Sequence, residues 1–116
     1  SDFPTYCPRT SAKLWREMSE YLSRDSETSQ WLSGLLASTT RSFIRDGIAD
    51  DQALVRNKAG WISEDGCYST CDAGLIDVDG DTYIMSIMTS MPWSDRSSEL
   101  VAAIAKIFFD TRAALA

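Results

Sequence analysis

The sequence predicts an α+β fold with short helices first, then a three-stranded antiparallel meander, and one long helix at the carboxy terminus. Apolar residues recur at helical spacing over residues 10–48 and again over about residues 97–114. Between them, residues 53–90 alternate between apolar and polar side chains and contain two Asp-Gly turn signals. Helices that are segregated from an antiparallel sheet define the α+β class.

The segment 10–48 is predicted to contain three helices. Thr10 or Ser11 can cap the first, because their hydroxyls accept hydrogen bonds from free backbone N–H groups. Ser26 can cap the second, and Glu27 lies in its first turn, where the helix dipole favours an acid. A short third helix is expected to end at Gly47. The expected buried faces of the first two helices are Leu14, Trp15, Met18, Tyr21 and Leu22, and then Trp31, Leu32, Leu35 and Leu36.

Three strands are predicted where the alternation is clearest, at residues 53–62, 69–78 and 81–90. The turn signals Asp65-Gly66 and Asp79-Gly80 separate them, so consecutive strands are expected to pair as antiparallel hairpins. Asp72, in the second strand, is expected to be structural and to accept turn N–H groups.

The last predicted helix, over about residues 97–114, has Ser94, Ser97 or Ser98 as its cap and a strong apolar face. One such helix can cover only one face of a three-stranded sheet. The other face and the two sheet edges need more cover than three short elements provide. The sequence therefore predicts part of a larger structure.

Composition excludes several classes of function. The chain has 116 residues, 44% of them apolar, with a net charge of −6 and scattered basic residues, so nucleic acid is not an expected partner. No apolar run is long enough to insert into a membrane. The first residues lack the basic and hydrophobic regions of a signal peptide. The chain contains no histidine, and Cys67-x3-Cys71 is at most half a zinc site, so neither a metal nor a cofactor is predicted.

The strand from Val55 to Trp61 resembles the Lys-Thr-Gly strand of class A serine β-lactamases and penicillin-binding proteins. The order of the surrounding segments is similar to that family too, at Pro8–Ala12, Trp31-Leu32, Thr39-Thr40, Arg45–Ile48, Asp72–Ile76, Tyr83–Thr89 and the last helix. The resemblance covers nearly all of this chain but less than half of the family's domain. It implies that residues 1–116 are the carboxy-terminal part of a single domain with a partial β-lactamase/transpeptidase-like fold.

The resemblance implies roles for four residues of this strand. Lys58 is the expected catalytic residue, with an ammonium that points into the cleft, helps to hold a substrate carboxylate and supports proton transfer at the serine. Gly60 would let the substrate amide approach the strand, because no Cβ intrudes. Ala59 and Trp61 are the other expected substrate-binding residues, and Trp61 could wall the cleft or simply pack. Ala59 lacks the hydroxyl that the family's threonine offers to the carboxylate.

The chain also lacks the Ser-x-x-Lys and Ser-x-Asn motifs of the family, so it is not expected to act alone. The first hypothesis is a segment of an extracytoplasmic serine hydrolase that acts on β-lactams, with antibiotic resistance as the outcome, or on peptidoglycan-type amides. The second is a non-catalytic binding or scaffold domain that kept the fold, and the third is an unrelated small α+β domain. The expected partners are a small molecule of these classes in the parent protein, the missing amino-terminal part of the domain, or a second copy in a homodimer.

Overall fold

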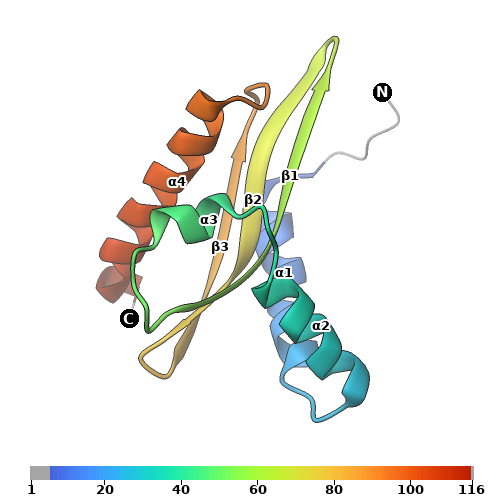
Figure 1. The fold of residues 1–116 in the computed structure, drawn as a ribbon, viewed down its shortest axis with the longest axis vertical. Helices are drawn as coiled ribbons and strands as arrows, with labels where there is room; N and C mark the ends of the chain where they lie inside the picture. Colours follow the sequence, from blue (N-terminus) through green and yellow to red (C-terminus); the bar gives the residue numbers. More distant parts are fainter. Residues whose placement is uncertain (1–5, 116) are drawn as a thin grey trace.

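The computed structural model describes residues 6–115 as an antiparallel sheet with helices on both of its faces (Figure 1). The α+β prediction, with its sequential three-stranded meander and long final helix, is confirmed. The first five residues, whose sequence lacks signal-peptide features, lie outside this range. The elements are α1 (Pro8–Leu22), α2 (Glu27–Ala37), α3 (Phe43–Gly47), β1 (Leu54–Glu64), β2 (Cys67–Val78), β3 (Asp81–Thr89), α4 (Asp95–Asp110) and the 3₁₀ turn η1 (Arg112–Leu115).

The helix boundaries follow from capping chemistry. Helix α1 begins at Pro8 with Cys7 as its cap residue, so the prediction of Thr10 or Ser11 as the cap is wrong. Proline is favoured at this first position because it lacks the N–H that would be unsatisfied in a first turn. The cap residue Ser26 is confirmed, since its hydroxyl accepts the N–H of Ser29. At α4, Ser94 is the cap and Ser97 completes a reciprocal capping box, so this helix begins at residue 95.

The sheet divides the interior into two apolar clusters. One lies between the sheet and α3 and α4, and includes Ile44, Ile76 and Val101, each fully buried. The other lies between the sheet and α1 and α2, and includes Trp15 and Leu75. Figure 1 shows α4 on one side of the strands and α1 on the other. Along each strand, successive side chains therefore point in turn towards α3 and α4 on one face and towards α1 and α2 on the other.

The strand register is fixed by two short turns. Asp79 and Gly80 both have positive φ, 54° and 81°, as the two central residues of a tight hairpin turn require, and Gly66 has φ 79°. The resulting pairing places Lys58 opposite Ala73. In the order β1-β2-β3, both β1 and β3 are edge strands.

Part of the predicted core is on the surface instead. The prediction that Trp31 is a core residue is wrong, because Trp31 is 65% exposed. Leu35 is exposed too. Helix α2 packs only through the narrow face that carries Leu32 and Leu36. Three apolar residues of α4 are exposed in the same way: Leu100, Ile107 and Phe108.

Candidate functional site

A groove of about 430 Å³ runs between α1 and the exposed half of β1. Its walls come from α1, through Trp15 and Met18, and from the sheet, through Lys58, Gly60 and residues of β2 and β3. Lys58 and Gly60 meet the same groove because alternate residues of a strand face the same side. Lys58 and Gly60 therefore line the same groove, and their roles in binding or catalysis stay a prediction.

Lys58 is exposed, and its ammonium donates to the carbonyl oxygen of Ala59. Among residues 6–115 it forms no ion pair. Without an ion pair in this part of the chain, the Lys58 ammonium is available to an anionic group of a ligand. The position on an edge strand also keeps this side chain accessible.

Gly60 is not required by the packing around it. A Cβ added there would meet only the Sγ atom of Cys71, at 3.4 Å, which is an ordinary contact. Gly74 differs, because its Cβ would lie 2.2 Å from the carbonyl oxygen of Arg56 on β1. The absence of a side chain at Gly60 thus leaves open space on the groove side of β1. At Gly74, the absence of a side chain instead allows β1 and β2 to approach each other closely.

Ala59 and Trp61 direct their side chains to the opposite face of the sheet. Ala59 is 3% exposed and packs in the cluster beneath α3 and α4, so it borders the groove mainly through its backbone. Trp61 is not among the groove-lining residues, and its ring instead stacks on Trp93 with 4.8 Å between the ring centroids.

A buried polar network holds β1 just before Lys58. Asn57 is fully buried, and its amide donates to both carboxylate oxygens of Asp72, at 2.8 and 3.0 Å. Asp72 also accepts the backbone N–H of Ile44 at 3.0 Å, as expected for a structural acid. Burial raises the pKa of the Asp72 carboxyl, although the hydrogen bonds from Ile44 and Asn57 act in the opposite direction.

Arg45 ties the same network to the loops around it. Its guanidinium donates to the carbonyl oxygen of Val55 at 2.8 Å and to Asn57 Oδ1 at 3.2 Å. It donates as well to the carbonyl oxygens of Ala37 and Thr39. We did not predict Asn57 and Arg45 as supporting residues. The strand alternation contained a signal for Asn57, because it places this polar residue between the inward-facing Val55 and Ala59.

The family of this chain is shown by a family model that matches almost the whole length of the chain. A model of the β-lactamase enzyme family matches residues 1–111. The chain belongs to this family. No curated protein matches the chain.

Solved structures show the same fold for this β-lactamase-family chain. PBP-A superposes with a TM-score of 0.73 and 20% sequence identity, over 91% of this chain and 39% of PBP-A. A β-lactamase from Chitinophaga pinensis superposes with a TM-score of 0.68 and 20% identity, over 91% of this chain and 41% of that one. A mutant of PBP-A, described as an acyl-enzyme complex with penicillin G, superposes with a TM-score of 0.71 at 20% identity, over 91% of this chain and 39% of that one. The chain therefore spans about two fifths of the length of these structures.

The described part of this β-lactamase-family chain holds no cluster of three or more histidine, cysteine, aspartate or glutamate side chains that could bind a metal. Its three cysteines, Cys7, Cys67 and Cys71, are free thiols. Burial raises the pKa of the Cys71 thiol, which borders the groove, so thiolate chemistry is disfavoured there. No helix among residues 6–115 has the length and apolar character needed to cross a bilayer.

Proposed function

We propose that this chain supplies the lysine-bearing strand of a serine acyl-transfer site that acts on β-lactams or peptidoglycan-type amides. The observation that carries the proposal is the position of Lys58 and Gly60 on one side of an open edge strand, facing the groove beneath α1. The fold shared with PBP-A and the β-lactamase supports it. The proposal places the parent protein outside the cytoplasm, where peptidoglycan-type substrates occur.

In this mechanism the rest of the domain provides the serine. Its hydroxyl attacks the amide carbonyl, its proton passes through a general base to the leaving nitrogen, and water then hydrolyses the acyl-enzyme. The ammonium of Lys58 attracts the substrate carboxylate and stabilises negative charge near the serine oxygen. The unpaired outer edge of β1 offers backbone groups to the substrate, and the absent side chain at Gly60 permits close approach.

One observation favours a non-catalytic scaffold as the second candidate. Position 59 carries alanine, which packs in the core and offers no hydroxyl to a substrate carboxylate. The two candidates differ in the part of the parent protein outside this chain. Ser-x-x-Lys and Ser-x-Asn motifs there support the enzyme, and their absence supports the scaffold.

Labelling with a fluorescent penicillin tests the proposal. The full-length parent protein should acquire a covalent label that survives denaturation, whereas the 116-residue chain alone should acquire none, because it lacks the nucleophile. Prior treatment with a serine-directed inhibitor should remove the label from the parent. An unlabelled but folded parent would favour the scaffold, and inhibitor-sensitive labelling of the isolated chain would contradict the division of roles.

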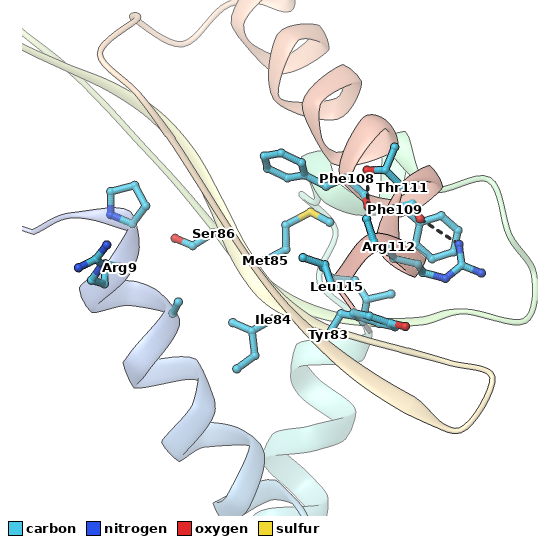
Figure 2. A pocket seen from close by; sticks show the side chains of 14 residues that line it. Arg9, Tyr83, Ile84, Met85, Ser86, Phe108, Phe109, Thr111, Arg112 and Leu115 are labelled. Atoms are coloured by element: carbon cyan, nitrogen blue, oxygen red, sulfur yellow. Dashed lines mark hydrogen bonds between the residues drawn. The ribbon is translucent and has the colours of Figure 1, made fainter.

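We also propose that the rest of the domain covers a second groove, at the outer edge of β3. This groove, of about 510 Å³, lies between the start of α1 and the end of α4 (Figure 2). Three of its apolar residues are exposed: Ile84, Phe108 and Leu115. An unpaired strand edge beside apolar surface favours addition of a strand. This chain covers only 39% of PBP-A, which supports the remaining part of the domain as the occupant of the groove. A second copy of the chain is the alternative occupant.

The isolated chain is therefore expected to self-associate at micromolar concentration in sedimentation velocity experiments. Ile84→Lys should shift it towards monomer, because a charge on an edge strand opposes strand pairing. Leu35→Lys, at an exposed position on α2 away from this groove, is the matched control and should leave the distribution unchanged. A monomer with a cooperative melt would show that the β3 edge needs no cover.

A further inference from the structure

Three segments that are distant in the sequence bring Arg41, Trp61 and Trp93 together on the surface. Trp61 belongs to β1, Trp93 precedes α4, and Arg41 lies between α2 and α3. The two indole rings stack with 4.8 Å between centroids and 29° between planes. The Arg41 Cζ atom lies 4.8 Å from the centroid of Trp93 and 5.8 Å from that of Trp61.

The aromatic pair is open to solvent yet held in place. Trp61 and Trp93 are 41% and 40% exposed, so each residue leaves part of its surface available to a ligand. The indole N–H of Trp93 donates to the hydroxyl of Ser98 at 3.1 Å, and its backbone N–H donates to that of Ser63 at 3.3 Å. A ligand that stacks here meets rings that are already ordered, which lowers the entropic cost of binding.

Arg41 adds a positive charge to the cluster. Its guanidinium forms no ion pair with any residue from 6 to 115, although the chain carries a net charge of −6. Contact with the faces of two aromatic rings orients the guanidinium without neutralising it. The cluster therefore combines exposed indole surface with a cationic group that can bind an anion.

We propose that Arg41, Trp61 and Trp93 form a binding platform for an acidic sugar, a pyranose ring that carries a carboxylate. The C–H groups of such a ring stack on the negative face of an indole, and the carboxylate pairs with Arg41. A sugar fits an open platform better than an apolar aromatic ligand does, because its hydroxyl groups keep their contacts with water.

The choice of sugar rests on the function proposed above, which names peptidoglycan-type substrates. Trp61 follows Lys58 by three residues on β1, which corresponds to about 10 Å along the strand. This odd spacing puts the two side chains on opposite faces of the sheet, so the platform is a surface separate from the groove at Lys58. The matching peptidoglycan-type group is muramic acid whose lactyl carboxylate bears no peptide.

Ligand-observed NMR titration of the 116-residue chain tests this inference without any catalytic step. N-acetylmuramic acid should bind saturably, and N-acetylglucosamine, which differs by the lactyl carboxylate, should bind about threefold more weakly, as expected for an exposed ion pair. Arg41→Gln should abolish this preference and leave the binding of N-acetylglucosamine unchanged. Trp61→Ala and Trp93→Ala should each weaken binding of both sugars by about tenfold or more.

Trp31→Ala is the matched control, because Trp31 is an exposed tryptophan on α2 and should leave both affinities unchanged. Circular dichroism verifies folding, and Trp93→Phe, which keeps a ring for stacking, should retain most of the affinity if the alanine variant is unstable. The platform proposal would be overturned if neither sugar bound saturably. It would also be overturned if Trp93→Ala and Arg41→Gln both left binding intact. Such a failure would leave the penicillin-labelling result unaffected, so the two proposals are tested separately.

Discussion

Replacement of Lys58 by alanine in the full-length parent protein should slow acylation by a fluorescent penicillin about 100-fold or more, the effect of removing one preorganised electrostatic contact. The same change should alter the free energy of unfolding by no more than about 0.5 kcal/mol, as at other surface positions. Lys58 is exposed, forms no ion pair within residues 6–115, and contacts only the carbonyl of Ala59 through its ammonium. Single-turnover labelling kinetics and urea unfolding measure the two quantities.

Lys13→Ala provides the matched control, because Lys13 is an exposed lysine on α1 that does not line the groove. It should leave acylation unchanged. Gly60→Ala adds a second test, since the added Cβ fits against Cys71 but occupies the space left for the substrate. Normal acylation by Lys58→Ala would remove the chemical basis of the proposed site, whereas loss of folding in that variant would give Lys58 a structural role.

A large loss of stability is expected for Gly74→Ala. The added Cβ would lie 2.2 Å from the carbonyl oxygen of Arg56 and 2.8 Å from the Cα of Asn57, and both are backbone atoms of β1. They cannot rotate away, so β1 and β2 must separate at the centre of their pairing. We expect the free energy of unfolding to fall by at least about 3 kcal/mol in urea unfolding experiments, at the upper end for overpacking.

Gly34→Ala is the control for the same substitution. Gly34 lies within α2, and a Cβ there would contact nothing within 4 Å. Alanine favours the helix over glycine, so this variant should gain about 0.5–1 kcal/mol. Equal stabilities for the two variants would mean that β1 and β2 are not packed as closely as the structure shows.

The meander could be predicted from the sequence because its determinants are local. Asp65-Gly66 and Asp79-Gly80 mark the turns, and the period of two assigns each residue to a face. This reasoning also placed Lys58 and Gly60 on one side of β1. The groove that they line could not be predicted in the same way, because its other wall is α1, whose position depends on long-range packing.

Residues with distant partners were the ones that sequence patterns described poorly. Trp61 stacks on Trp93, and nothing in the sequence near either residue indicates this contact. Trp31 has the spacing of a buried helical residue but lies outside the face that packs. Asn57 and Asp72 are buried polar residues whose hydrogen bonds satisfy each other across two strands. The strand alternation marks Asn57 as an inward-facing polar residue, but it does not say which buried group is its partner.

The sheet order β1-β2-β3 is also the order along the chain, and this favours early pairing of the strands. Every strand pairing closes through a short turn, so the sheet has low contact order and its hairpins can form within microseconds. A further strand at the outer edge of β3 would come from outside residues 54–89 and would require closure of a long loop or an encounter between molecules. The meander should therefore fold early. Completion of the sheet at β3 should be the slow step, and its rate should determine how long this edge is exposed to aggregation.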